Sequence, residues 1–144
     1  MENEKWKVEN KMYAYFSLYG FECEPRKITE RAGLTPTEFW RKGDIDEYRR
    51  KRKNSCWKLY SRLDQREDLE NHIEDVLLQI DANAEEFKSL SGEYNGLLQL
   101  VGYFYQYYPG LSLESRIVEK LGFYKLGFDC DFYYLYSEKR EDTY

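Results

Sequence analysis

Alternating apolar and polar positions predict β-strands in several parts of the chain. Between residues 12 and 19 the more apolar set should face the core, and it comprises Met12, Ala14, Phe16 and Leu18. The other set is Tyr13, Tyr15, Ser17 and Tyr19. This period of two is the signature of a half-buried strand. The stretches 55–62 and 123–136 alternate in the same way, and a short strand is expected at Phe39 and Trp40. Residues 94–108 are apolar in both sets, which predicts a central strand covered on both faces.

Helical spacing appears in three further segments. Residues 25–33 should form a short helix that begins at Pro25 and ends at Gly33. Asp64 and Glu67 have the spacing of a capping box, and apolar residues at steps of three and four follow as far as Leu90. This pattern predicts one long helix that ends at Gly92. A last helix is expected from a cap at Ser112 to Gly122.

The predicted order is β-α-β-β-α-β-α-β, which indicates an α+β fold. The first six elements follow the ferredoxin-like β-α-β-β-α-β plan, and an α-β unit is appended. We expect one mostly antiparallel sheet with helices mainly on one face. A chain of 144 residues fits one domain. We predict a flexible leader at residues 1–10, a single domain at 11–136 and a mobile tail at 137–144.

Composition narrows the class of protein. Hydrophobic residues make up 42% and aromatic residues 18% of the chain, which argues against disorder. The three cysteines form no CxxC pair, so we expect small buried side chains in a reducing compartment. The charged N-terminus does not resemble a signal peptide, and no apolar run is long enough to span a membrane. We therefore expect a cytoplasmic protein with no membrane contact.

Five consecutive cations, Arg49 to Lys53, stand out in a chain of net charge −5. Acidic residues precede this basic run, and it lies between Gly43-Asp44 and a predicted strand. We interpret it as a solvated hairpin loop whose charges discourage edge-to-edge aggregation. The alternatives are a docking site for an acidic partner and a phosphate-binding site. Because the remaining sequence is acidic, we predict no nucleic-acid partner.

Fifteen tyrosines are the strongest anomaly in the composition. The polar-side residues of the first and last strands should meet on one open sheet face, and they are Tyr13, Tyr15, Tyr19, Asp129, Asp131 and Tyr133. Tyrosine gives a large contact area for few frozen torsions, and carboxylates select a basic partner. This set is our candidate partner-binding surface. The alternatives are that the rings only cover the sheet or that they form a homodimer interface.

Candidates for catalysis are few. Asp129 and Asp131 are the best carboxylate pair, but further ligands for a metal ion are not marked nearby. His72, the single histidine, is expected at the surface or its boundary, without a serine or cysteine partner. The familiar nucleophile, phosphate-loop and zinc motifs are not found. We predict no catalytic residue, no metal and no cofactor, and favour a protein that is not an enzyme.

Four residues are interpreted as structural anchors of the second hairpin. They are Trp40, Gly43, Asp44 and Trp57. An alternative assigns Trp40 and Trp57 to a ligand-stacking pocket, in which case the protein would bind a small molecule or act as an enzyme.

The order of these motifs resembles a known family. The matching features are the Ile28-Thr29 helix start, the stretch 33–36, Gly43-Asp44, Trp57 and the final strand from Asp129 to Tyr133. Over Tyr13 to Tyr133 the chain resembles the bacterial family called domain of unknown function 4279. The resemblance implies a compact α+β fold and assigns no activity, cofactor or residue role.

These observations favour a non-enzymatic binding module. A concrete form is an immunity-type protein that masks a basic toxin with its acidic, tyrosine-rich face. Its acidic background, its tyrosine content and the lack of catalytic motifs support this hypothesis.

Overall fold

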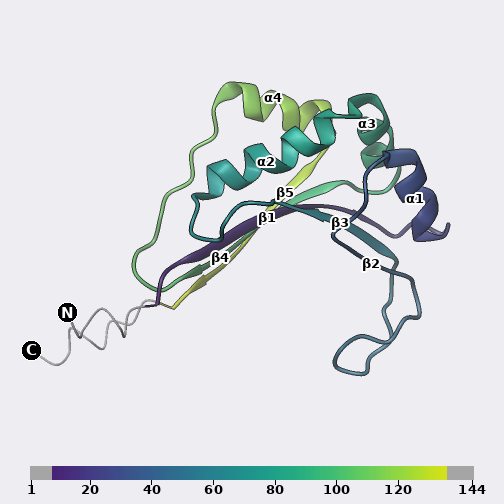
Figure 1. Ribbon diagram of the computed structural model, residues 1–144, viewed down its shortest axis with the longest axis horizontal. Helices are drawn as coiled ribbons and strands as arrows, with labels where there is room; N and C mark the ends of the chain where they lie inside the picture. The colour runs from purple at the N-terminus through teal and green to yellow at the C-terminus, as the bar shows by residue number, and fades with distance from the viewer. Residues whose placement is uncertain (1–7, 136–144) are drawn as a thin grey trace, which may run out of the picture.

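The computed structural model describes residues 8–135, in which four helices lie beside one open five-stranded sheet (Figure 1). The elements in chain order are β1 (Lys11–Tyr19), α1 (Pro25–Ala32), β2 (Glu38–Trp40), β3 (Cys56–Tyr60), α2 (Leu69–Asp81), α3 (Ala84–Glu93), β4 (Leu97–Phe104), α4 (Ser115–Phe123) and β5 (Gly127–Tyr134). The α+β prediction is confirmed. Every predicted strand is present, but the last begins at Gly127 rather than Phe123, because α4 extends to Phe123.

The strands lie in the order β2-β3-β1-β4-β5. β1 pairs antiparallel with β3 and with β4, and β2 pairs antiparallel with β3. β5 runs parallel to β4 because α4 crosses back between them. The sheet is therefore mixed, and β1 lies at its centre.

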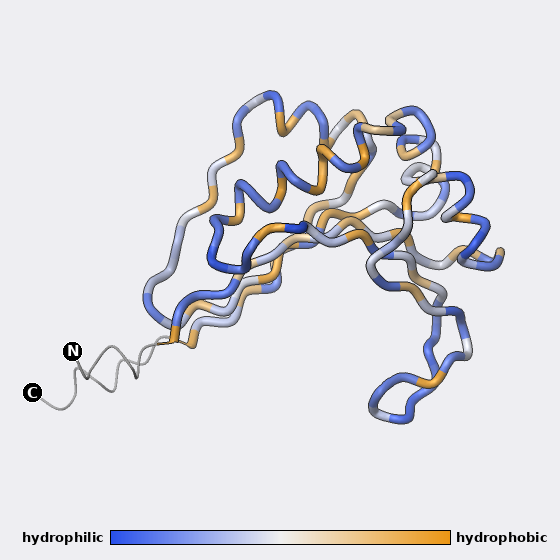
Figure 2. The backbone as a smooth tube through the Cα atoms, viewed as in Figure 1, coloured by the Kyte–Doolittle hydropathy of each residue, from blue (hydrophilic) through white to orange (hydrophobic). Residues whose placement is uncertain are grey.

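All four helices lie on one side of the sheet (Figure 1), and they bury the apolar set of each inner strand. Phe16 of β1, Trp57 of β3 and Phe87 of α3 pack ring against ring at the middle of this layer. The indole Nε1 of Trp57 donates to Thr29 Oγ1 of α1 at 3.0 Å. Hydrophobic residues recur along the helices and the inner strands, whereas the loop between β2 and β3 is largely hydrophilic (Figure 2).

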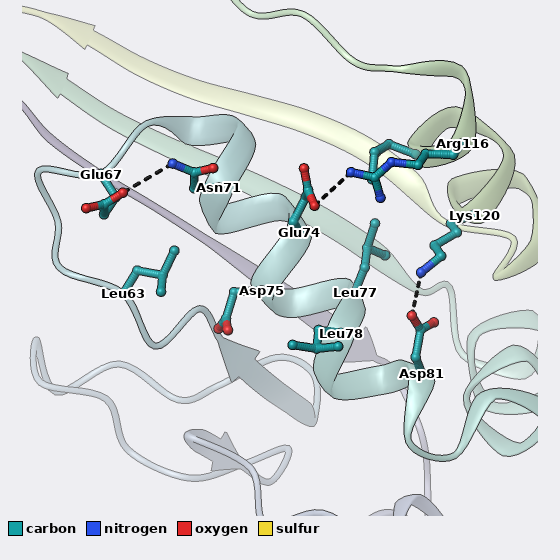
Figure 3. Close-up of a pocket in the computed structure, with 11 residues that line it drawn as sticks. Leu63, Glu67, Asn71, Glu74, Asp75, Leu77, Leu78, Asp81, Arg116 and Lys120 are labelled. Atoms are coloured by element: carbon teal, nitrogen blue, oxygen red, sulfur yellow. Dashed lines mark hydrogen bonds and ion pairs between the residues drawn. The ribbon is translucent and has the colours of Figure 1, made fainter.

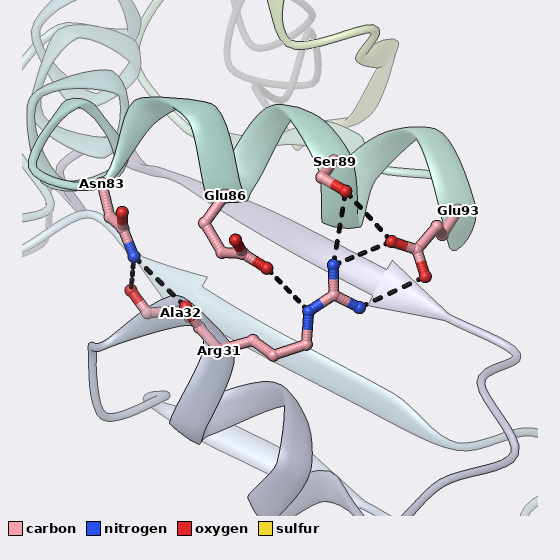
Figure 4. A network of polar contacts seen from close by, with 6 residues as sticks. All are labelled: Arg31, Ala32, Asn83, Glu86, Ser89 and Glu93. Atoms are coloured by element: carbon pink, nitrogen blue, oxygen red, sulfur yellow. Dashed lines mark hydrogen bonds and ion pairs between the residues drawn. The ribbon is translucent and has the colours of Figure 1, made fainter.

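The single long helix predicted for residues 64–92 is wrong, because the chain breaks at Asn83 between α2 and α3. Asn83 has non-helical torsions, and its side-chain amide donates to the carbonyl oxygens of Arg31 and Ala32 (Figure 4). Those carbonyls end α1 and have no partner inside their own helix. A tertiary contact therefore sets the break, and no glycine or proline marks it in the sequence.

The same corner is held by Arg31 of α1, which reaches across to α3 (Figure 4). Its Nε donates to Glu86 at 2.7 Å and its Nη2 to Glu93 at 2.8 Å. These hydrogen bonds raise the pKa of Arg31 and lower the pKa of Glu93. The network fixes α1 against α3 and thereby covers the Trp57 side of the sheet.

The helix starts also differ from the prediction. α2 begins at Leu69 with Asp68 at its cap position. Asp64 instead closes a turn, in which its carboxylate accepts the backbone N–H of Arg66 at 2.8 Å. α4 begins at Ser115, so Gly122 lies inside the helix, and the Ser112 N–H donates to Glu70 rather than capping. Asp64 therefore bonds within its own turn, and Ser112 bonds a carboxylate 42 residues away, so neither residue acts as a helix cap.

The predicted tail at 137–144 and residues 1–7 of the predicted leader lie outside the described residues. Of the other leader residues, Val8 and Glu9 are exposed, whereas Asn10 is buried. Its side chain accepts the backbone N–H groups of Tyr105 and Gln106 and donates to the carbonyl of Tyr107. Asn10 thus holds the loop after β4 and belongs to the folded domain. None of the described helices has the length and apolar character needed to cross a membrane.

Candidate functional site

The sheet face opposite the helices is the candidate site. Strand register places its side chains in rows across neighbouring strands. One row runs Tyr60, Tyr15, Gln99, Asp129, and the next runs Tyr13, Val101, Asp131. A third row joins Lys11, Tyr103 and Tyr133. We call the five rings of Tyr13, Tyr15, Tyr60, Tyr103 and Tyr133 the tyrosine face.

The tyrosine face is preorganised by stacking between its own rings. Tyr60 stacks on Tyr15 with ring centroids 4.9 Å apart and on Tyr13 at 5.6 Å. Tyr103 stacks on Tyr133 at 4.9 Å with an interplanar angle of 11°. Burial raises the pKa of the Tyr15 phenol to about 12 and also raises the pKa of Tyr13 and Tyr60. The phenols of Tyr13, Tyr15 and Tyr60 are therefore neutral at physiological pH.

One end of the face is acidic. The hydroxyl of Tyr133 donates to the Asp131 carboxylate at 3.0 Å, and this hydrogen bond raises the pKa of Tyr133. Burial is the largest cause of the raised pKa of the Tyr13 phenol, and the charges of Tyr103 and Asp131 raise that pKa further. The strand register places Tyr13 of β1 and Asp131 of β5 in one row, with Val101 of β4 between them. The predicted meeting of the first and last strands is thus realised across the intervening β4.

The other end carries cations in contact with rings. Lys58 Nζ lies 4.5 Å from the ring centroid of Tyr15 and 4.8 Å from that of Trp40. Arg52 lies over Trp40 at 3.8 Å. Glu38 accepts a hydrogen bond from the Tyr60 hydroxyl and pairs with Lys58 at 3.9 Å. This end has little uncompensated negative charge.

Tyr19 and Asp129 are the two predicted partner-binding residues that lie apart from the ring clusters. Tyr19 is at the end of β1, where its hydroxyl accepts a hydrogen bond from Asn54 at 2.8 Å. Asp129 projects from β5 beside Gln99 and is exposed. Tyr19 therefore belongs to the base of the β2–β3 loop, whereas Asp129 adds a second carboxylate to the acidic end.

The predicted anchors divide between the two faces of the sheet. Trp57 is fully buried among the helices, whereas Trp40 lies on the open face beside Lys58. The idea that both tryptophans line one ligand pocket is therefore wrong, because their side chains lie on opposite faces of the sheet. Gly43 has φ 93°, and it and Asp44 hold the base of the loop through hydrogen bonds with Arg52 and Arg41.

The basic run lies in the loop between β2 and β3, which projects from the sheet on the side away from the helices (Figure 1). A bridge between Ile45 and Lys51 makes this loop a small hairpin. Asp46 Oδ1 accepts the N–H groups of Tyr48 and Arg50 and closes its tip. We call residues 41–55 the basic arm. Its cations are exposed or half-exposed, as a solvated loop requires.

His72 is buried rather than at the surface, and it does have a serine partner. Its Nδ1 lies 2.7 Å from Ser61 Oγ, and Ser61 Oγ also accepts the N–H of Ala14. Ser61 thus extends the pairing of β1 beyond the end of β3. Burial lowers the pKa of His72. The His72 ring is fully buried, and its Nε2 has no hydrogen-bond partner among the described residues.

The cysteine prediction holds for one of three residues. Cys56 is buried, and burial raises the pKa of its thiol to about 11. Cys23 is half-buried and Cys130 is exposed, because β5 lies at the sheet edge. In residues 8–135 no group of three or more His, Cys, Asp or Glu side chains is placed to hold a metal ion.

A shallow groove of about 360 Å³ separates α2 from α4 (Figure 3). Most of its charged groups are already paired, with Arg116 donating to Glu74 at 2.9 Å and Lys120 bonded to Asp81. Asp75 is held by Arg62 at 2.7 Å. Glu67 is exposed and forms no ion pair within residues 8–135, and its carboxylate accepts a hydrogen bond from the Asn71 amide. We interpret the groove as the boundary between the two helices.

Comparison with known proteins agrees with the order of motifs. A family described as Domain of unknown function (DUF4279) matches residues 10–135. The chain belongs to this family. No curated protein and no solved structure matched the chain. DUF4279 membership thus establishes the kind of domain and assigns no activity.

Sequence reasoning missed several residues on the open face of this DUF4279 domain. Tyr60, Lys58, Tyr103, Gln99 and Trp40 lie there with the predicted residues. Alternation in the strand 56–60 separated the two side-chain sets correctly, whereas in residues 97–104 both sets are apolar and alternation did not distinguish them. What it could not supply was the strand order, which brings β3 and β4 to either side of β1.

Proposed function

We propose that this DUF4279 protein is a binding module that holds a basic protein partner on its tyrosine face. A concrete form is an immunity-type protein in a bacterial cytoplasm that masks a basic toxin. The observation that carries the proposal is the open sheet face, which no helix covers within residues 8–135.

The rings favour a protein partner. Stacked tyrosines lose little further conformational freedom on binding, and each presents a large area with a polar tip. Tyr13, Tyr15, Tyr60 and Tyr103 are half-buried, so they are held in place by their neighbours and still reach solvent. Such a surface resembles the aromatic centre of protein interfaces.

The charges favour a basic partner. Asp131 accepts a hydrogen bond from Tyr133, and Asp129 forms no ion pair with any other residue in the described part of the chain. A cation placed between these carboxylates would gain a charge-assisted contact and faster encounter at low salt. The net charge of −5 adds to this preference.

Affinity capture from an extract of the source organism tests the proposal. The wild-type protein should retain a basic protein whose purified form binds more weakly as salt rises. Asp129→Asn with Asp131→Asn should weaken binding of that purified partner about tenfold, the equivalent of about 1.4 kcal/mol.

The matched control carries Glu85→Gln and Glu119→Gln. Both are exposed on helices of the opposite side, so this variant has the same change in net charge. It should bind as the wild type does. Equal weakening in both variants would indicate only a long-range effect of net charge, and unchanged binding in the aspartate variant would overturn the proposed face.

A further inference from the structure

β5 is an exposed edge of the sheet. Within residues 8–135 it pairs with β4 alone, and seven of its eight residues are exposed, Phe132 being the exception. The opposite edge, β2, has only three residues and leads directly into the basic arm. Short edge strands and edge cations prevent unwanted pairing. β5 has neither protection, since it is long and contains no lysine, arginine or proline.

The backbone of β5 directs free hydrogen-bonding groups outward. The N–H of Gly127 donates to Gly96 O at 2.9 Å, and the N–H of Leu135 donates to Phe104 O at 2.8 Å. In a parallel ladder alternate residues bond the neighbouring strand, so the odd-numbered residues of β5 face β4. The residues whose N–H and C=O groups point away from the sheet are therefore Phe128, Cys130, Phe132 and Tyr134.

The side chains of β5 alternate in chemistry as well as in direction. Asp129, Asp131 and Tyr133 project to the open face, in register with Gln99, Val101 and Tyr103. The intervening residues project toward the helix layer, which leaves Phe128 38% and Tyr134 57% exposed. An incoming strand would thus meet carboxylates on one face and apolar side chains on the other.

We propose that β5 accepts a sixth strand from a partner protein, formed by an extended segment in which Lys or Arg alternates with apolar residues. The inference rests on the proposed function and specifies how the basic partner is held. In an antiparallel addition, the outward-bonding residues take hydrogen-bonded positions. Asp129 and Asp131 then take the positions where opposing side chains approach most closely, which places the partner's cations against both carboxylates.

Charge argues against a second copy of this chain as the occupant. Two β5 strands paired antiparallel about Cys130 would place Asp129 opposite Asp131 of the other copy. Pairing about Asp131 would place that residue opposite itself. Like charges directly opposite are destabilising, and each copy carries a net charge of −5. A cationic segment removes this repulsion.

The test uses the full chain and a seven-residue peptide in which lysine and valine alternate. Amide exchange should slow on peptide addition at Phe128, Cys130, Phe132 and Tyr134, whose N–H groups point outward. A peptide of the same composition with its lysines and valines in separate blocks should bind at least about tenfold more weakly, because it cannot present both faces at once.

Cys130→Pro separates strand addition from simple charge attraction. Proline is tolerated on an edge strand where the N–H faces solvent, so pairing with β4 should persist while one outward donor is lost. Cys130→Ala keeps the backbone donor and serves as the control. We expect the proline variant alone to bind the alternating peptide at least about tenfold more weakly, with unchanged thermal unfolding.

The outcomes distinguish the two proposals. If both Cys130 variants bind as the wild type and the outward amides exchange as before, strand addition is overturned. The proposed function still stands in that case if Asp129→Asn with Asp131→Asn weakens binding of the captured partner. If the proline variant unfolds, the test of strand addition is whether the peptide slows amide exchange at the outward N–H groups of β5 in the wild type. Dimerisation of the wild type through β5, detected by light scattering, would overturn the choice of occupant.

Discussion

The imidazole Nδ1 of His72 lies 2.7 Å from Ser61 Oγ inside the fold, and the burial of this imidazole predicts a pH dependence of stability. Burial lowers the pKa of His72 below its unfolded value of about 6.5. As the pH falls through that value, the unfolded chain binds a proton before the folded chain does. The free energy of unfolding should therefore be highest well above pH 6.5 and fall as the pH drops from about 6.5 toward 5.5, by at most about 1.4 kcal/mol per pH unit.

Urea unfolding at several pH values measures this effect. The chain has one histidine, so His72→Gln should flatten the dependence in this window. Carboxylates with a lowered pKa, such as Asp64 at about 2, contribute only at more acidic pH. A variant that kept the full slope would show that another group binds the proton.

Arg31 should contribute measurably to stability because it joins α1 to α3. Arg31→Gln removes its hydrogen bonds to Glu86 and Glu93. Its side chain is about one-third exposed, so solvent screens the pairs, and we expect a loss of about 1 kcal/mol in urea unfolding. Arg26→Gln, which removes the exposed pair with Glu30 on the same helix, should change stability little. Equal losses in the two variants would contradict a special role for the α1–α3 corner.

Neutralising the basic arm should leave the fold intact. Arg49, Lys51 and Lys53 are exposed and make no ion pair with other residues in 8–135. Replacing all three with Gln should change the free energy of unfolding by less than about 0.5 kcal/mol. Asp46→Ala removes two backbone hydrogen bonds and should instead speed amide exchange at Gly43 and Arg52.

The same triple variant tests the prediction that nucleic acid is not a partner. Fluorescence anisotropy with a labelled single-stranded oligonucleotide should show only weak binding by the wild type, with no specific loss in the variant. Tight binding that disappears on neutralisation would prove the interpretation of the arm as a solvated hairpin wrong. The matched control is Arg26→Gln, Lys27→Gln and Lys125→Gln, which removes the same charge from other surfaces.

Features set by local periodicity could be predicted from the sequence, and features set by distant contacts could not. Alternation identified β1 and assigned Phe16 to the core and Tyr15 to the open face, as the structure shows. The break at Asn83 was missed because its partners, the carbonyls of Arg31 and Ala32, are about fifty residues away. The burial of His72 was missed for the same reason, since a polar side chain is stable inside only with a partner such as Ser61.

The candidate site shows the same limit. Tyr13 and Asp131 could be assigned to one face from alternation, but Tyr60 and Tyr103 join them only through the strand order. The long apolar run at 94–108 was expected to be covered on both faces. β4 is indeed largely buried. On the open face, however, its side chains are covered by side chains of the neighbouring strands and not by another layer of structure. The periodicity of apolar residues therefore predicts that a strand is buried, but it does not predict which element buries it.

Trp40 and Trp57 should respond very differently to the same substitution, although both were interpreted as anchors. Trp57 is fully buried, and Trp57→Phe would leave a cavity beside Phe16 and remove the bond from its indole to Thr29. We expect a loss of about 2–3 kcal/mol. Trp40 lies on the open face, where its Nε1 donates to Asn54 O at 3.0 Å. Water can replace that bond in Trp40→Phe, so the expected loss is below about 1 kcal/mol.

Urea unfolding of the two variants gives the comparison, and tryptophan fluorescence locates the change. Phe keeps the stacking surface for Arg52 and Lys58 in the Trp40 variant, so the basic arm should keep its position. Similar losses in both variants would mean that the open face at Trp40 is packed as tightly as the core. That result would count against an exposed tyrosine face, because Trp40 and Tyr15 share the same cation, Lys58.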